Sequence, residues 1–528
     1  MDDMSPHESA AEAPRPHPVA LGTSPLTVDD VVAIARHDAP VILTDAARHQ
    51  ITHTRSVIEA LADDAMPHYG ISTGFGALAT TSIPLEKRAQ LQRSLVRSHA
   101  AGTGPEVERE VVRALMTLRL ATLATGRTGV ALTTAEVYAD ILNAGITPIV
   151  HEYGSLGCSG DLAPLAACAL TAMGEGEVRD AQGCRRPTAE VLAEAGITPV
   201  TLREKEGLAL INGTDGMLGM LCLALTDLTH LLRCADITAA LSVEGLLGTD
   251  RVFAPDLHAL RPHPGQAAAA ANMAAVLAGS PIRASHDNHA CTRVQDAYSL
   301  RCAPQVHGAA RDTVAHARDV AIRELAAAID NPVVTLDDRV ESNGNFHGAP
   351  LGYVLDFLAI AVADVASMSE RRTDRFLDPA RNHGLPPFLA DDPGTDSGHM
   401  IAQYTQAAIV SELKRLAVPA SVDSIPSSAM QEDHVSMGWS AARKLRRALD
   451  GLGRVLAVEL LTAARGITVR DPLRPGPAGS AAVDALHVAG WEGAGPDRWL
   501  APQIETAYEV LRSGQLVTAV EEAVGPLR

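Results

Sequence analysis

Apolar side chains recur at helical spacing over several stretches of more than twenty residues, which points to long helices packed side by side. These stretches belong to a set that covers 206–233, 235–247, 309–329, 350–370, 398–418 and 437–465. Aromatic residues make up only 3% of the chain, and Ala and Leu are prominent among the apolar residues. Such a composition favours helices because unbranched side chains lose little rotamer freedom there. We predict an all-α fold built on a bundle of long helices.

The 528-residue chain divides into four parts by composition. Residues 1–20 are acidic and contain several prolines, which predicts a disordered tail. Residues 21–205 alternate short helical patterns with segments rich in Gly, Pro, Ser and Thr, and we expect an N-terminal domain there. The long helical patterns make 206–470 a central helical bundle. Residues 471–528 form a C-terminal region that is rich in Pro and Gly before a short helix near 503–513.

Charge and cysteine content exclude several classes of protein. The chain has 44 Lys and Arg against 63 Asp and Glu, a net charge of -19, which disfavours binding to nucleic acids and to anionic membrane surfaces. Its seven cysteines include no Cys-x-x-Cys pair, so neither a disulfide framework nor a structural zinc site is indicated. Most of the 20 histidines are scattered singly, and we expect no metal site.

The sequence also indicates where the protein works. Its first twenty residues lack the basic and apolar regions of a signal peptide. The most apolar stretch, 216–232, is interrupted by Thr226, Asp227 and Thr229, so we interpret it as a buried core helix rather than a membrane span. We predict a cytoplasmic protein.

Local signals mark where two helices begin. The sequence Thr133-Thr134-Ala135-Glu136 is a capping-box pattern, which predicts a helix that continues to Gly145. Asp161, with Pro164 shortly after it, is a predicted N-cap of a second helix.

The loop of small residues at 154–161, GSLGCSGD, leads into that second helix. Its spacing alone is compatible with a plain tight connection, a phosphate-binding loop, a cysteine nucleophile or a backbone cyclisation. A phosphate-binding loop would need a lysine after the glycine, and none is present. Cys158 at a helix N-terminus would have a favoured thiolate, but the sequence does not place a base beside it.

In the cyclisation, the Gly160 nitrogen attacks the Cys158 carbonyl carbon across Ser159. Loss of one water from the ring and one from the Ser159 side chain would leave a methylidene-imidazolone, a strong electrophile made from the protein alone. The residues of the loop permit this cyclisation, but they do not favour it over the other interpretations of the loop.

Resemblance to a known family favours the cyclisation. GSLGCSGDLAPLA resembles the signature loop of the aromatic amino acid ammonia-lyase family, in which Ala-Ser-Gly forms the 4-methylidene-imidazol-5-one group, MIO, without an external cofactor. Cys158 replaces the usual Ala, but its side chain is a spectator, so the resemblance implies MIO from Cys158, Ser159 and Gly160. Other stretches similar to the family follow in the family's order: YGISTGFG (69–76), INGT (211–214), VQDAYSLRCAPQV (294–306), DNP (330–332), NGNFHGAP (343–350), SERR (369–372) and QEDHVSMG (431–438).

Two positions indicate histidine as the substrate. His99 lies in SHAAG, which resembles the stretch that faces the substrate imidazole in histidine ammonia-lyases, and the passage 421–452 is similar to actinobacterial members of that branch. Glu432 could accept a hydrogen bond from an imidazole N–H, whereas against a phenyl ring it would be a costly unpaired charge. The resemblance implies deamination of L-histidine to trans-urocanate and ammonia, the first step of histidine degradation.

The resemblance also implies roles for other residues. Tyr69 would be the catalytic base, and its phenol pKa of ~10 would have to be lowered, for example by a helix N-terminus. Arg301 would bind the substrate carboxylate with its planar fork. Gln295, Tyr298 and Asn212 would hold the carboxylate and the surroundings of MIO, with Tyr298 counted among the catalytic residues.

Phe346 would line the substrate pocket. If 295–301 is helical, the spacing of Gln295, Tyr298 and Arg301 places all three along one side. The family is further expected to form a homotetramer whose active sites draw residues from more than one subunit.

Two alternatives stay open at this point. A tyrosine or phenylalanine ammonia-lyase, or an aminomutase, would use the same MIO, although His99 and Glu432 argue against an apolar substrate. A catalytically silent helical paralogue would keep the fold without the chemistry. Cys158 and the pair Ala166-Ala167, which stands where many relatives have a His, leave room for this second alternative.

Overall fold

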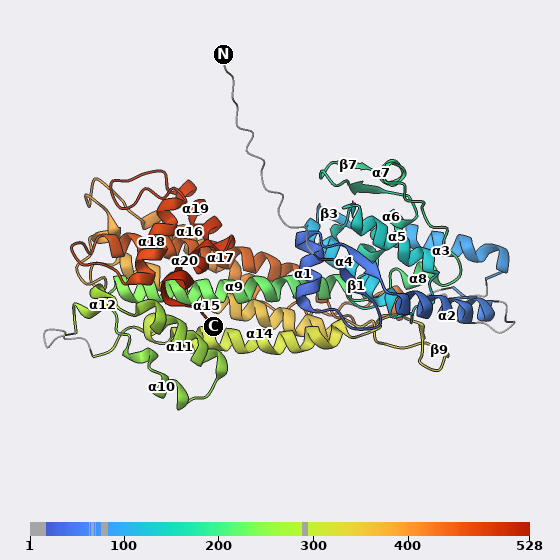
Figure 1. The fold of residues 1–528 in the computed structure, drawn as a ribbon, viewed down its shortest axis with the longest axis horizontal. Coiled ribbons are helices and arrows are strands. Elements are labelled where there is room, and N and C mark those ends of the chain that lie inside the picture. Colours follow the sequence, from blue (N-terminus) through green and yellow to red (C-terminus); the bar gives the residue numbers. More distant parts are fainter. Residues whose placement is uncertain (1–16, 63, 65–67, 69, 75–82, 288–293) are drawn as a thin grey trace, which may run out of the picture. The chain divides into compact units, whose positions relative to one another are not determined.

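The computed structural model describes residues 17–62, 64, 68, 70–74, 83–287 and 294–528, and most of them are helical (Figure 1). The predicted all-α fold is confirmed. The chain forms two compact units. Unit 1 consists of the described residues up to Gly219, Ile322–His347 and Pro426–His434, and unit 2 consists of Met220–Ala321, Gly348–Ile425 and Val435–Arg528. The division into four parts at 20, 205 and 470 stays a prediction.

Unit 1 combines short helices with strands of two to four residues. Its elements are β1 (Val19–Leu21), α1 (Val28–His37), β2 (Val41–Leu43), α2 (Asp45–Ala62), α3 (Leu85–His99), β3 (Thr103–Glu106), α4 (Arg109–Ala124), α5 (Leu132–Asn143), β4 (Thr147–Pro148), β5 (His151–Tyr153), α6 (Leu162–Ala172), β6 (Glu177–Arg179), β7 (Arg185–Pro187), α7 (Thr188–Glu194), α8 (Glu206–Ala209), β8 (Val333–Val334), β9 (Val340–Glu341) and the 3-10 turn η4 (Ser428–Met430).

The strands of unit 1 pair into small sheets of two or three strands. β1 pairs in parallel with β2, β3 is antiparallel to β5, β6 lies between β4 and β7, and β8 pairs with β9. The core of the unit is helical, with α4 buried along most of its length and packed against α1 and α5. The small sheets therefore connect the segments between helices, and the core of the unit is made by the helices.

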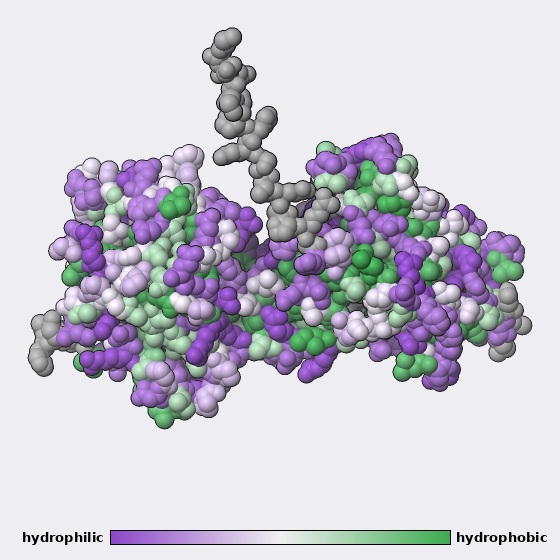
Figure 2. Space-filling model, viewed as in Figure 1, coloured by the Kyte–Doolittle hydropathy of each residue, from purple (hydrophilic) through white to green (hydrophobic). Residues whose placement is uncertain are grey.

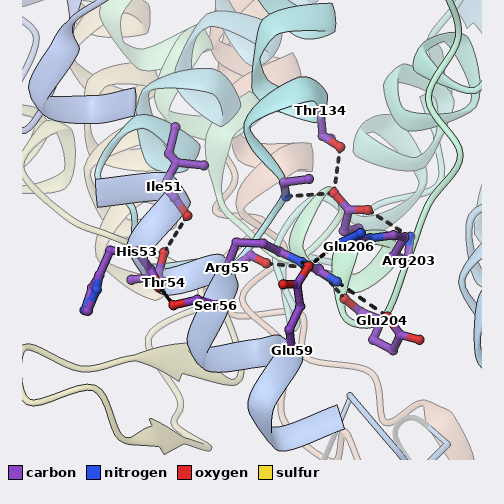
Figure 3. A network of polar contacts seen from close by, with 12 residues as sticks. Ile51, His53, Thr54, Arg55, Ser56, Glu59, Thr134, Arg203, Glu204 and Glu206 are labelled. Atoms are coloured by element: carbon purple, nitrogen blue, oxygen red, sulfur yellow. Dashed lines mark hydrogen bonds and ion pairs between the residues drawn. The ribbon is translucent and has the colours of Figure 1, made fainter. Parts of the chain in front are cut away.

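A buried carboxylate replaces the predicted capping box at the start of α5. Glu206 Oε1 accepts hydrogen bonds from the Ala131 amide at 2.9 Å and from Thr134 Oγ1 at 2.6 Å, while its Oε2 accepts one from the Arg203 amide at 2.8 Å (Figure 3). Helix α5 begins at Leu132 with no side-chain cap of its own. The capping-box prediction is wrong because α5 already begins at Leu132, which places Thr133 inside the first turn rather than at the N-cap.

The same network reaches α2. Arg55 donates to Glu59 at 3.0 Å and to the Glu204 carbonyl at 3.0 Å, and Arg203 pairs with Glu59 as well (Figure 3). Residues 203–206 are thereby fixed just ahead of the INGT stretch at 211–214.

Unit 2 contains the long helices. Its elements are α9 (Asp215–Gly245, whose first turn belongs to unit 1), η2 (Arg251–Phe253), α10 (Pro255–Ala259), α11 (Pro264–Leu277), α12 (Pro281–Ala284), α13 (Tyr298–Arg301), α14 (Ala303–Leu325, whose last turn belongs to unit 1), α15 (Ala349–Leu377), η3 (Pro387–Leu389), α16 (Met400–Leu416), α17 (Gly438–Thr468), α18 (Pro477–Val488), α19 (Leu500–Arg512) and α20 (Gln515–Val524).

Helices α15, α16 and α17 pack against one another along their apolar faces (Figure 1). The helical stretches predicted at 350–370, 398–418 and 437–465 are confirmed by these three helices. The separate stretches expected at 206–233 and 235–247 are corrected: α9 is one helix, because the buried Cys234 continues the apolar run without a break.

Within the part of the chain that the structure describes, two helices, α9 and α15, are long and apolar enough to cross a membrane by length and composition alone. The most apolar windows of these helices are 72% and 61% buried inside the protein, which is the pattern of core helices. On the face seen in Figure 2, hydrophilic residues predominate and hydrophobic ones lie in scattered groups.

Candidate active site

The loop between β5 and α6 carries Cys158, Ser159 and Gly160 in unit 1. Gly160 has a φ of +80°, and a Cβ there would lie 2.0 Å from the Gly213 carbonyl oxygen. Only glycine can occupy this position, because a side chain would require both a strained backbone and displacement of its neighbour. The Asp161 amide donates to the same Gly213 oxygen at 2.7 Å, so the loop is pressed against the INGT stretch.

Asp161 links the loop to the start of α9. Its carboxylate accepts hydrogen bonds from Ser155 Oγ at 2.8 Å and from the amides of Gly216 and Met217 at 2.9 and 3.0 Å. Asp161 is the N-cap residue of α6, as predicted, but its side chain makes no capping hydrogen bond to α6 and bonds to the first turn of α9 instead. Burial raises the pKa of Asp161 to about 7, against the opposing effect of these hydrogen bonds.

Asn212 also contacts this loop. Its Nδ2 donates to the Ser159 carbonyl oxygen at 2.7 Å. Its own carbonyl accepts from the buried Arg119 guanidinium at 3.1 Å, and Arg119 also donates to Ala209 and Ile329 carbonyls. Asn212 is therefore held by its backbone while its amide faces Ser159.

Glu432 contacts the tripeptide through both of its carboxylate oxygens. Its Oε1 accepts a hydrogen bond from Ser159 Oγ at 3.0 Å, and its Oε2 accepts from Cys158 Sγ at 3.1 Å and from Ser427 Oγ at 3.0 Å. Among the described residues, no Lys, Arg or His forms an ion pair with Glu432. The carboxylate is half-buried with neutral donors only.

The segment that presents Glu432 is strained. Ser427 and Glu432 exchange backbone hydrogen bonds of 2.9 and 3.3 Å, closing a tight loop. Inside it, Ser428, Ala429 and Met430 all have φ between 52° and 69°, a conformation that non-glycine residues adopt at a cost. Strain of this kind persists where the surrounding structure imposes a particular geometry.

His99 ends α3 and is within electrostatic range of Glu432. Its Nδ1 lies 2.9 Å from the Leu95 carbonyl, which can only accept, so the neutral ring carries its hydrogen on Nδ1 and Nε2 is left as an acceptor. Burial lowers the pKa of His99, and the Leu95 carbonyl and the charge of Glu432 oppose that shift. The ring is therefore neutral at pH 7.

The structure thus brings together His99, Cys158, Ser159, Gly160, Asn212 and Glu432. Phe346 is half-buried in unit 1, in the loop between β9 and α15. Its neighbour His347 stacks on His434, with ring centroids 5.7 Å apart, which links this loop to the segment of Glu432. Tyr69 lies outside the described residues.

Gln295, Tyr298 and Arg301 belong to unit 2. Only Tyr298 and Arg301 lie on the short helix α13, and the exposed Gln295 precedes it, so the single helical face considered for all three does not form. The Arg301 guanidinium covers the Tyr298 ring at 4.7 Å from its centroid, and its Nε donates to the Asp296 carbonyl at 3.0 Å. Among the described residues, no acceptor is hydrogen-bonded to the other Arg301 N–H groups, which suit an anion.

Two residues of the site escaped the sequence analysis. Ser427 bears no motif, and its role depends on a backbone pairing with Glu432 that spacing does not reveal. Arg119 had a detectable signal, because it is a cation among apolar residues of one helix, as Arg113 is, and this suggests a buried structural role. In the part of the chain that the structure describes, no group of three or more His, Cys, Asp or Glu side chains is placed to hold a metal ion.

Comparison with known proteins places this geometry in a family. The family model described as aromatic amino acid lyase matches residues 26–488. The chain is 67% identical to a histidine ammonia-lyase of Streptomyces coelicolor, over 97% of this chain and 100% of that protein. Among solved structures, a tyrosine aminomutase from Streptomyces globisporus matches with a TM-score of 0.90 and 38% identity, covering 97% of this chain and 100% of that one.

A histidine ammonia-lyase from Trypanosoma cruzi matches with a TM-score of 0.88 and 38% identity, covering 96% of both chains. The family match spans most of the sequence and includes the loop at 154–161. The chain therefore belongs to the aromatic amino acid lyase family.

Proposed function

We propose that the protein eliminates ammonia from L-histidine and releases trans-urocanate, as the first step of histidine degradation in the cytoplasm. The observation that carries this proposal is the environment of Glu432. A half-buried carboxylate that receives only neutral donors keeps its charge uncompensated. An imidazolium ring would supply the missing positive charge and an N–H donor, whereas a phenyl or phenol ring would not.

His99 strengthens the preference for imidazole. Its Nε2 is an acceptor, and Glu432 is a second acceptor close by. An imidazolium has two N–H donors, one for each. The relatives from Streptomyces coelicolor and Trypanosoma cruzi that are named histidine ammonia-lyases support the same substrate.

The tripeptide suits formation of MIO. Gly160 has no side chain to obstruct attack by its nitrogen, and its φ of +80° is a backbone conformation that glycine adopts without strain. Asn212 donates to the Ser159 carbonyl oxygen, where it would withdraw electron density from a ring that contains that carbonyl. MIO supplies an electrophilic methylidene carbon, which makes ammonia easier to expel, and no external cofactor is needed.

The remaining roles come from the family resemblance. Tyr69 removes the β-proton of the substrate, Arg301 binds the carboxylate together with Gln295 and Tyr298, and Phe346 lines the pocket. The Tyr69→Phe protein should still lose two water molecules by intact mass but turn over very slowly. Normal turnover by this variant would remove Tyr69 from the role of base.

The test is to incubate the purified protein separately with L-histidine, L-tyrosine and L-phenylalanine. Ultraviolet absorbance would follow the conjugated acrylate products, and mass spectrometry would identify each one. We expect urocanate from histidine alone, and an intact protein mass lower by two water molecules. Coumarate or cinnamate as the main product would overturn the substrate.

A second candidate is an aminomutase or lyase that acts on tyrosine, because the Streptomyces globisporus tyrosine aminomutase has nearly the same fold. The charge of Glu432 argues against it. A β-amino acid product from tyrosine would establish this alternative. An unmodified protein mass together with no product from any substrate would instead establish a silent paralogue.

We further propose that the protein is a homotetramer with shared active sites. Tyr353, Phe357 and Ile360 follow one face of α15 and are 61%, 48% and 46% exposed, and Ile401 and Tyr404 on α16 are 58% and 61% exposed. Apolar side chains at such spacing favour burial against another subunit. Light scattering should give the mass of four chains, and a fully active monomer would contradict the proposal.

A further inference from the structure

The three hydrogen bonds to Glu432 are divided unequally between its two oxygens. Oε1 has one donor among the described residues, the Ser159 hydroxyl at 3.0 Å. Oε2 has two, the Cys158 thiol at 3.1 Å and the Ser427 hydroxyl at 3.0 Å.

This division matters because the proposed cyclisation removes the Ser159 hydroxyl as water. Oε1 then loses its donor. The donors on Oε2 are not consumed, since Ser427 lies outside the tripeptide and Cys158 contributes only its backbone to the ring. Burial, followed by the interaction with Glu432, raises the pKa of the Cys158 thiol to about 12, so the thiol keeps its proton and stays a donor.

We propose that Ser427 and Cys158 are positioning residues that hold Glu432 by Oε2 and so present Oε1 to the imidazole N–H of the substrate. The inference rests on the proposed function and assigns the specificity of that site to a three-residue arrangement. Ser427 fixes the carboxylate from its own loop, and Cys158 fixes it from the loop that carries the electrophile.

The backbone around Ser427 supports a built arrangement. The backbones of Ser427 and Glu432 are joined by hydrogen bonds in both directions, and their side chains meet as well, with Ser427 Oγ 3.0 Å from Glu432 Oε2. A carboxylate tethered at one oxygen loses less rotational freedom when it binds a ligand through the other. The usual Ala in place of Cys158 would provide no donor, so this chain has one tether more than a typical relative.

The kinetic test uses Ser427→Ala and Cys158→Ala. We expect each to raise KM for L-histidine by about three- to tenfold. Each variant removes one hydrogen bond to the charged Glu432, and its effect reaches the substrate only through Glu432. kcat should change less than KM. Ser427→Thr should keep the wild-type KM because it retains the hydroxyl donor. Residue 427 has an extended backbone, which a β-branched residue adopts readily.

Ser428→Ala is the matched control. It makes the same chemical change one residue away, at an exposed side chain. We expect wild-type KM for this variant. In the Glu432→Gln background, Ser427→Ala should add little to the increase in KM, since the residue it positions has lost its charge. Equal and additive effects in the two backgrounds would overturn the inference.

A binding measurement separates positioning from catalysis. In the Ser159→Ala background, which lacks the hydroxyl and cannot form MIO, calorimetry should show L-histidine binding weakened about three- to tenfold by Ser427→Ala. Binding of L-phenylalanine should not change. Unchanged histidine affinity in this background would overturn the inference even if the kinetic variants failed to mature.

The failure of the inference differs from the failure of the proposed function. If the wild-type protein makes urocanate while Ser427→Ala and Cys158→Ala keep its KM, the positioning role is wrong and the proposed function stands. If the wild-type protein makes no urocanate, the function itself is wrong.

Discussion

Glu459 in unit 2 and Glu432 in unit 1 are both glutamates that accept several hydrogen bonds, but their partners differ. Glu459 lies within α17, is fully buried, and both of its oxygens are occupied. Arg372 donates to each oxygen at 2.5 and 3.0 Å, Ser242 and Thr238 donate at 2.7 and 3.1 Å, and Ser369 donates at 2.6 Å. Its charge is neutralised within the bundle.

Among the described residues, Glu432 has three hydrogen-bond donors and no cation paired with it. The thiol and hydroxyls that reach it are neutral, and one of them is the hydroxyl that the proposed cyclisation removes. Withdrawing a carboxylate from water without a partner charge has a cost even at half burial, and this cost is offset where a ligand supplies the charge. The number of hydrogen bonds therefore does not separate a structural carboxylate from a functional one. The presence of a fixed cation does.

The largest expected effect comes from Ser159→Ala. This change removes the precursor of the electrophile, so turnover of histidine should fall on the order of a thousandfold or more. Thermal unfolding should stay close to that of the wild type, because the Glu459 network is untouched. Intact mass should show no loss of two water molecules, and a variant that keeps wild-type turnover would exclude the proposed electrophile.

Glu459→Gln should have the largest effect on stability. It leaves the Arg372 guanidinium buried without its counter-charge, which should lower the free energy of unfolding by about 3–5 kcal/mol. Denaturant unfolding followed by circular dichroism measures the change. The double variant Glu459→Gln/Arg372→Met should recover part of the loss, whereas a stable single variant would show that the pair is not structural.

Glu432→Gln makes the same chemical change in the other unit and should do the reverse. The free energy of unfolding should change by less than about 1 kcal/mol, since no cation is left unpaired. KM for L-histidine should rise about tenfold, because a neutral amide attracts an imidazolium less strongly than a carboxylate does. Comparable loss of stability in the two variants would remove the distinction between the carboxylates.

The sequence revealed each region to a different extent. The helices of unit 2 could be predicted because a repeat of 3.6 residues over more than twenty positions has few other interpretations. The tripeptide could be found because its chemistry depends on adjacent residues. Glu432 could not be paired with Ser159 by spacing, since 273 residues separate them. Only the resemblance to a family suggested that they share a site.

Polar side chains were the hardest to place. Asp161 has the sequence context of a cap for α6, yet its carboxylate bonds to the amides of Gly216 and Met217. Thr134 likewise bonds to Glu206 rather than to its own helix. In both cases a group distant in sequence offers a better partner than the local backbone does, and local pattern contains no information about it.

Acidification should make the surroundings of Glu432 more like those of Glu459, and it is the smallest of the four expected effects. His99 has a pKa lowered below its usual 6.5, so its neutral, accepting form is present at pH 7 and is lost as the pH falls through that lowered value. The charged ring would then pair electrostatically with Glu432, as Arg372 does with Glu459, and its Nε2 would become a donor. KM for L-histidine should therefore rise relative to His99→Gln, which keeps an acceptor that does not titrate. The substrate's own ionisation cancels in the ratio of the two KM values, and this ratio should increase as the pH falls below 6.5 towards the lowered pKa of His99. A ratio that is constant over this range would show that Glu432 keeps its free charge for a reason other than the neutrality of His99.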